Sequence, residues 1–197
     1  MVVNQTLEIV KFPDFTVPYQ QIGMLRDQVV TIYRDAFRAP PYNKGEEELV
    51  DFARSFPQHM HREGFRMVAV GDKAGRIVGF AYGYTSAPGQ WWHENVAKAV
   101  QPQIALEWLA NSFQLVEIAV TPGFQGQGIG GLLHDHLLTG LPHRKAVLST
   151  LQAETNAYRM YRGRGWVVLL EDCFFPGIVR AYRVLGLALG KKGEDAA

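Results

Sequence analysis

The chain has 197 residues, 47% of them hydrophobic and 20% charged, and its formal net charge at pH 7 is +1. This is the composition of a globular protein that can bury one core, so we expect a single domain over residues 1–197. A near-neutral charge argues against nucleic acid or a membrane surface as the partner, and any anionic ligand must be held locally. The lone cysteine, Cys173, excludes an internal disulfide framework. Since no apolar run is long enough for a membrane span, we expect a cytoplasmic protein.

The first part of the chain is predicted to form a strand, two helices and a hairpin. The assignments follow from period-two and helical spacings of apolar residues and from the Pro and Gly residues that interrupt them. In order, they are a strand over residues 6–12, a helix over 22–37, a helix from Glu46 to about Arg62 that Pro57 bends or divides, and a hairpin of residues 65–70 and 76–84.

The second part alternates strands and helices. Residues 86–110 have a weak period and are expected to be a partly helical excursion. They are followed by a strand over 113–120, a glycine-rich connection, a helix from Ile129 that ends by Gly140, a strand over 145–151, a helix over 156–162 and closing strands over 166–170 and 178–184. This order predicts a mixed α/β sheet with helices on both faces.

The connection VTPGFQGQGIGG, residues 120–131, holds five of the chain's 20 glycines. Glycine allows a positive φ and a close approach of the backbone to a ligand, so amide N–H groups can turn toward one point. Where such a loop enters a helix N-terminus, it forms an anion site that needs no net charge. The stretch therefore predicts a bound pyrophosphate group.

Two phosphate-binding patterns fit these letters. Read from Gly126 they match GxGxxG, the dinucleotide fingerprint, and read from Gln125 they match QxxGxG. In the dinucleotide fold the first glycine sits in the tight turn at the end of the first strand, whereas five residues, TPGFQ, separate Val120 from Gly126 here. The stretch also lies two-thirds of the way along the chain, which favours the second pattern.

The segment FQLVEIAVTPGFQGQGIGGLLHDHLL resembles the acetyl-CoA-binding motif of the GNAT superfamily of N-acetyltransferases. Gln125, Gly128 and Gly130 fill its three defining positions, with Gln in place of the commoner Arg. The segment ETNAYRMYRGRGW resembles a second motif of that family. Its matching residues are Ala157, Met160, Tyr161, Gly165 and Trp166. The resemblance covers about residues 6–185 and leaves 186–197 as a tail.

The resemblance implies a six- to seven-stranded, mostly antiparallel sheet flanked by about four helices, with acetyl-CoA as cosubstrate. The loop would hold the pyrophosphate, and the backbone of the preceding strand would pair with the pantetheine arm. The implied binding residues are Ile118, Ala119, Val120, Gln125, Gly126, Gln127, Gly128, Ile129, Gly130 and Asn156. The family often has an Asn at the position of Glu154, and Asn156 lies two residues after it.

Acetyl transfer to an amine needs a base for the amine, donors for the oxyanion and a proton for the leaving thiolate. Tyr161 is the candidate acid, because the ordinary pKa of tyrosine, about 10, keeps it protonated at neutral pH. Glu117 is the candidate base, since burial in a covered strand would raise its pKa. The alternatives are a tyrosine packed on a helix face and a structural carboxylate. Neither histidine pair, His59/His61 nor His134/His136, shares a helix face, so no metal site is predicted.

The acceptor is expected to be a primary amine, attacked directly in a ternary complex. Residues 38–42 and 91–92 would form rigid, aromatic lips, and Glu94, Glu107 or Glu117 would attract a cationic amine. This favours a small molecule, including a polyamine or aminoglycoside. Acetylation of a protein N-terminus or lysine and a non-catalytic acyl-CoA-binding module stay open as alternatives, as does a homodimer.

Overall fold

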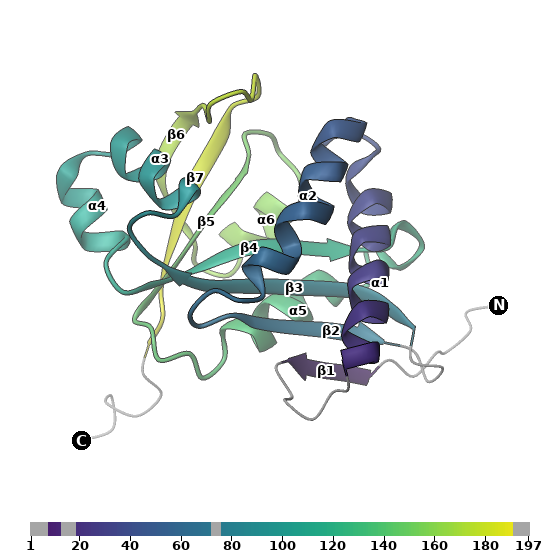
Figure 1. Cartoon of the computed structure of the whole chain (residues 1–197). Helices are drawn as coiled ribbons and strands as arrows, with labels where there is room; N and C mark the ends of the chain where they lie inside the picture. Colours follow the sequence, from purple (N-terminus) through teal and green to yellow (C-terminus); the bar gives the residue numbers. More distant parts are fainter. Residues whose placement is uncertain (1–7, 13–18, 72–75, 191–197) are drawn as a thin grey trace. The chain divides into compact units, whose positions relative to one another are not determined.

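The structure, a computed structural model, describes residues 8–12, 19–71 and 76–190. Contacts within the chain define two compact units, unit 1 (residues 1–84 and 117–137) and unit 2 (residues 85–116 and 138–197). Strand β4 (Ser112–Val120) contributes residues to both units. The strand order is β1-β2-β3-β4-β5-β7-β6 (Figure 1), as expected for a mixed sheet that is mostly antiparallel.

Unit 1 contains the antiparallel ladders of β1 with β2 and of β2 with β3. Its helices follow the sequence signals: three glutamates occupy the first turn of α2, and the Gly45 amide donates to Glu48 Oε2 at 3.0 Å. Its elements are β1 (Glu8–Phe12), α1 (Tyr19–Phe37), α2 (Glu46–His59), β2 (Arg66–Gly71), β3 (Ile77–Ser86), the short 3-10 turn η1 (Pro122–Phe124) and α5 (Ile129–Leu138), of which β3 and α5 end just inside unit 2.

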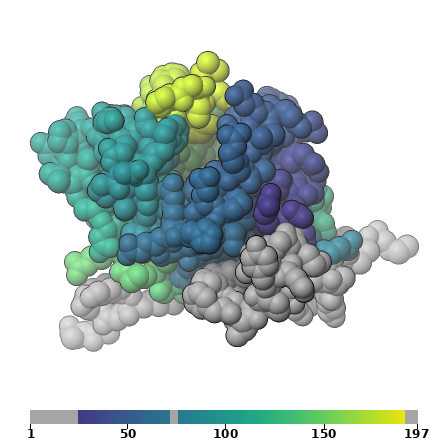
Figure 2. Space-filling view, viewed as in Figure 1, coloured from purple at the N-terminus to yellow at the C-terminus, as the bar shows by residue number. Residues whose placement is uncertain are grey.

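Helices cover both faces of the unit 1 strands. Phe80 of β3 stacks toward Phe52 of α2, with ring centroids 6.4 Å apart. Its neighbour Gly79 faces the other way, where a Cβ would come within 3.3 Å of Leu133 of α5. In Figure 1, α1 and α2 accordingly lie side by side in front of β3 and α5 lies behind it. The outer side of α2, drawn in blue in Figure 2, is exposed.

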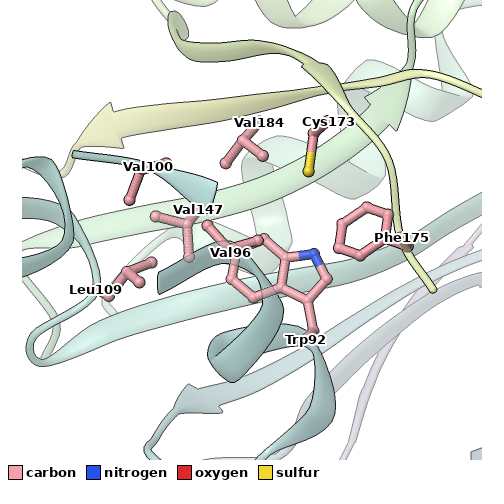
Figure 3. Close-up of a cluster of buried hydrophobic side chains, with 8 residues drawn as sticks. All are labelled: Trp92, Val96, Val100, Leu109, Val147, Cys173, Phe175 and Val184. Atoms are coloured by element: carbon pink, nitrogen blue, oxygen red, sulfur yellow. The ribbon is translucent and has the colours of Figure 1, made fainter. Parts of the chain in front are cut away.

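Unit 2 contains a parallel ladder, β4 with β5 over Ser112–Gln114, and antiparallel pairs of β7 with β5 and β6. A buried cluster packs around Trp92 and Phe175 (Figure 3), and its residues come from α3, β5, β6 and β7 and from the segments that follow α3, α4 and β6. The remaining elements are α3 (Trp91–Ala99), α4 (Pro102–Trp108), β5 (Lys145–Leu151), α6 (Asn156–Arg162), β6 (Val167–Cys173) and β7 (Tyr182–Ala188).

All four tryptophans of the chain, Trp91, Trp92, Trp108 and Trp166, belong to unit 2. Trp108 occupies the space beside Gly186 of β7, where a Cβ would lie only 2.5 Å from the indole ring. The Lys145 ammonium lies 4.9 Å from the centre of the same ring. Gly186 therefore serves close packing in the middle of a strand.

The fold class is as predicted, but several element bounds differ. The excursion forms two helices, so the described residues contain six α-helices instead of about four. Pro57 lies inside α2, which continues to His59. The closing strands run over Val167–Cys173 and Tyr182–Ala188, so the supposed tail begins inside β7. The start of the first strand, residues 72–75 of the hairpin turn and residues 191–197 lie outside the described residues.

Candidate functional site

The glycine-rich connection leaves β4 through a compact turn. The Thr121 amide donates to Val78 O of β3 at 2.9 Å, which fixes the point of departure from the sheet. The Phe124 amide then donates to Thr121 O at 2.8 Å, closing the 3-10 turn Pro122–Phe124. The five residues TPGFQ therefore form a hydrogen-bonded turn that connects the end of β4 to Gly126.

Gly126 and Gly128 have φ angles of 74° and 80°. This left-handed region suits glycine, and no atom lies within 4 Å of the place where either Cβ would be. The Gly128 carbonyl accepts a hydrogen bond from the Leu132 amide at 3.0 Å, so Gly128 caps α5. Because the first N–H groups of a helix have no partner inside it, the amides of residues 129–131 can serve an anion.

The two glutamines of the loop fold back on the backbone. Gln125 Nε2 donates to Val120 O at 2.9 Å, and Gln127 Nε2 lies 3.4 Å from Gly123 O. Gln125, the first position of the predicted motif, thus ties the loop to the end of β4. That this loop holds a phosphate through backbone amides and the helix dipole stays a prediction.

Residues 118–120 continue β4 beyond its ladder with β5, which covers Ser112–Gln114. Ala119 and Val120 are buried and Ile118 is half-buried. Ala119 O lies 3.1 Å from where a Gly79 Cβ would be, so β3 and β4 pack closely at this point. This part of β4 is the segment predicted to pair with an extended ligand arm.

Glu117 immediately precedes these residues and is half-buried. Burial raises the pKa of its carboxyl group, and the positive charge of Lys44 opposes that rise. No hydrogen bond or ion pair joins the carboxylate to another side chain in the described part of unit 1. An accessible but poorly solvated carboxylate with a raised pKa is suited to accept a proton near neutral pH.

Glu117 interacts electrostatically with two tyrosines of the neighbouring strand β3. The pKa of the hydroxyl group is raised in both Tyr82 and Tyr84 of β3, mainly by burial and also by the negative charge of Glu117. Tyr82 OH lies 3.0 Å from His59 Nδ1, and burial with the nearby Arg62 charge lowers the His59 pKa to about 4. His59 is therefore neutral at pH 7.

Sequence reasoning missed this group of residues. Phe80, Tyr82 and Tyr84 do show the alternation of a strand with one aromatic face, which was the available signal. The residue that contacts Tyr82 on that face, His59, comes from the end of α2. Its place depends on how α2 packs, which no local pattern encodes.

Tyr161 and Asn156 belong to α6 in unit 2. Thr155 Oγ1 caps this helix by accepting from the Tyr158 amide at 3.0 Å. Tyr161 is buried, with its ring 5.7 Å from that of Trp166 in an edge-to-face arrangement. Asn156 Oδ1 accepts from Arg159 Nη2 at 2.7 Å. The roles of both residues stay predictions.

No group of three or more His, Cys, Asp or Glu side chains arranged to hold a metal ion occurs within residues 8–12, 19–71 and 76–190. Among the helices of the described chain, none combines the length and the apolar character needed to cross a membrane.

Comparison with known proteins gives a consistent family. The family model described as "Acetyltransferase (GNAT) family" matches residues 26–166. A GCN5-like protein acetyltransferase of Mycobacterium tuberculosis is 31% identical over 189 residues, covering 81% of this chain and 89% of the relative.

Solved structures share the fold at low identity. The ribosomal-protein-S18-alanine N-acetyltransferase from Escherichia coli has a TM-score of 0.59 at 15% identity, covering 98% of this chain and 99% of that one. The PaiA N-acetyltransferase from Thermoplasma acidophilum, solved in complex with coenzyme A, has a TM-score of 0.61 at 12% identity over 93% of this chain and 99% of that one. The family model and the M. tuberculosis relative match this chain in its sequence, and they show that the chain belongs to the GNAT acetyltransferase family.

Proposed function

We propose that this enzyme transfers the acetyl group of acetyl-CoA to a primary amine by direct attack in a ternary complex. The observation that carries the proposal is the loop of residues 125–130, in which two positive-φ glycines lead into the N-terminus of α5. Family membership supports the reaction class. Glu117, which is half-buried, has a raised pKa and lies five residues before the 3-10 turn Pro122–Phe124, supports chemistry in addition to binding.

Each part of the reaction has a candidate group in the chain. Amides of the loop and of the α5 N-terminus would hold the pyrophosphate, and the backbone of Ile118–Val120 would hold the pantetheine arm. Glu117 would take a proton from the ammonium, directly or through a water, so that the neutral nitrogen attacks the thioester carbonyl. As the new C–N bond forms and the C–S bond breaks, Tyr161 would give its proton to the leaving sulfur.

The acceptor has two candidate classes. The partly exposed Glu117, on the strand next to β3 with its aromatic residues Phe80, Tyr82 and Tyr84, supports a small-molecule amine. The 31% identical relative is named a protein acetyltransferase, and that name supports a lysine or N-terminus of a protein as the acceptor. The buried free Cys173 agrees with work in a reducing compartment, as the cytoplasm is.

The test combines binding and turnover. Calorimetric titration should show acetyl-CoA binding and no NAD binding, and thiol release should then occur with members of an amine panel that includes lysine peptides. Tyr161→Phe should lower kcat by about 10²–10⁴-fold while the Kd for acetyl-CoA stays unchanged. Acetyl-CoA binding without thiol release on any amine would favour a non-catalytic acyl-CoA-binding module over an enzyme. Full turnover by Tyr161→Phe would show that Tyr161 is not the acid.

A further inference from the structure

A lysine beside the proposed base is held in a fixed position. Lys44 lies between α1 and α2, and its amide donates to Phe37 O at 3.0 Å. Its ammonium lies 4.5 Å from the centre of the Tyr33 ring and 4.6 Å from that of Phe37, and it donates to Tyr33 OH. Cation–π contacts and this hydrogen bond keep the charge near Glu117. Lys44 is therefore a fixed cation of this region of unit 1.

A second cation lies on the β3 side of the same region. The Arg62 guanidinium carbon lies 4.6 Å from the centre of the Tyr84 ring. Tyr84 and Tyr82 lie on β3, the strand next to the one that carries Glu117, and the charges of Arg62 and Glu117 both act on their hydroxyl groups. Arg62 is half-buried, which leaves part of the guanidinium for a ligand.

The charged groups that act on Glu117, Tyr82 and Tyr84 are Glu117 itself, Lys44 and Arg62. Glu117 supplies one negative charge, and Lys44 and Arg62 supply two positive ones, while His59 is neutral at pH 7 because its pKa is about 4. Glu46, at the start of α2, pairs with Arg38 at 3.4 Å, and Glu48 accepts from the Gly45 amide and keeps its negative charge. If one ammonium group of a doubly positive acceptor faces Glu117, Lys44 and Arg62 would repel the second.

We propose that the preferred acceptor is a primary amine with an anionic group near its nitrogen, and that Arg62 and Lys44 bind this anionic group while Glu117 faces the amine. The proposal rests on the proposed acetyl transfer and narrows its substrate class. An amino-acid-like small molecule and a lysine next to Asp or Glu in a protein share this chemistry. Polyamines and aminoglycosides, which the sequence favoured, do not have it.

Matched acceptors test the proposal. Aminovalerate, pentylamine and cadaverine have the same chain length and end in a carboxylate, a methyl group and a second ammonium. A second series consists of peptides with one lysine flanked by glutamate, glutamine or arginine. We expect kcat/KM to fall about tenfold from the anionic to the neutral member and further to the cationic one, in the series that contains the natural type of acceptor. The series with the higher kcat/KM distinguishes a small molecule from a protein.

Variants assign the effect to the two cations. Arg62→Met and Lys44→Met should each reduce the preference for the anionic acceptor several-fold, and Arg62→Glu should reverse it toward cadaverine or the arginine-flanked peptide. Arg54→Met is the control, because Arg54 is an exposed cation on α2 that pairs with Asp51 at 3.4 Å. It removes the same charge and should leave the preference unchanged. Melting temperatures of all variants show which remain folded.

The outcomes separate the two proposals. Thiol release that is equal across each series, or equal in wild type and Arg62→Met, would overturn the substrate-class proposal and leave acetyl transfer standing. Absence of thiol release with every amine would overturn acetyl transfer itself. If Lys44→Met fails to fold, two measurements still test whether cations bind the anionic group of the acceptor. These are the kcat/KM values of the Arg62 variants and the salt dependence of the wild-type preference, which should be lost at high salt.

Discussion

Glu117 combines two properties that usually exclude each other in a carboxylate. Its side chain is half-buried and so reaches solvent or a ligand, yet its surroundings are poor enough in water to raise its pKa. Lys44 limits the rise. A base needs this balance, since a fully solvated carboxylate is too weak a base near pH 7 and a fully buried one stays protonated.

The first prediction concerns the pH–rate profile. Because only the carboxylate form of Glu117 accepts a proton, kcat/KM of the wild type should rise with pH through a pKa above the ordinary range of glutamate. Glu117→Gln should lose this rise and lower kcat/KM by about 10²–10⁴-fold. Lys44→Met should move the rise to higher pH, because it removes the charge that opposes protonation. An unchanged profile for Glu117→Gln would exclude Glu117 as the base.

His59 gives a second prediction at the same scale. Its pKa is about 4 in the folded chain and about 6.5 unfolded, so the unfolded state binds more protons between these values. The stability from neutral His59 is complete above pH 6.5 and is lost as pH falls toward 4. In urea titrations, wild type should lose stability over this window more steeply than His59→Asn, by less than about 1.4 kcal/mol per pH unit. Parallel curves would contradict the assignment.

At the scale of elements, the loop and α5 act together. The positive φ of Gly128 lets the chain reverse direction just where its carbonyl begins the helix. A side chain in this conformation costs about 1–2 kcal/mol, and relief of the strain would turn the amides of α5 away from the ligand. The geometry of the loop therefore depends on the backbone conformation at residue 128, as it does at Gly126, which also has a positive φ.

The corresponding prediction compares two glycines of the same loop. Gly128→Ala should raise the Kd for acetyl-CoA about 5- to 30-fold, as the strain implies. Gly123→Ala is the matched control, because Gly123 has no positive φ and no atom within 4 Å of its would-be Cβ. Calorimetry on both variants gives the answer. Equal affinities would show that the loop conformation at residue 128 does not determine binding.

Elements defined by local chemistry were predictable, and those defined by distant partners were not. The strand–loop–helix around residues 113–138 follows from one apolar run, clustered glycines and a helical period. The last strand was placed about four residues too early, because its limits follow from pairing with β5, from Lys145↔Ala188 to Leu151↔Tyr182. In the same way, Glu117 was visible as an unusual carboxylate in an apolar strand, whereas Tyr82 and His59 meet only when α2 packs on β3.

At the scale of the whole molecule, ligand binding should appear as stability. Acetyl-CoA that binds only the folded chain stabilises it by about 2.7 kcal/mol at 100 times its Kd. For a chain of this size that raises Tm by roughly 5–10 °C. Thermal scans with increasing acetyl-CoA should show this shift, and NAD at equal concentration should not. A shift with NAD alone would favour the dinucleotide pattern over the acetyl-CoA motif.

The placement of all four tryptophans in unit 2 gives the protein a built-in optical label. Indole emission excited at the red edge of the absorption band would report on unit 2 alone, since unit 1 has tyrosines as its only phenolic or indole chromophores. Far-ultraviolet dichroism would report on the helices of both units. If the two signals change at the same denaturant concentration, the units unfold as one cooperative system, and if they separate, the fluorescence transition belongs to unit 2.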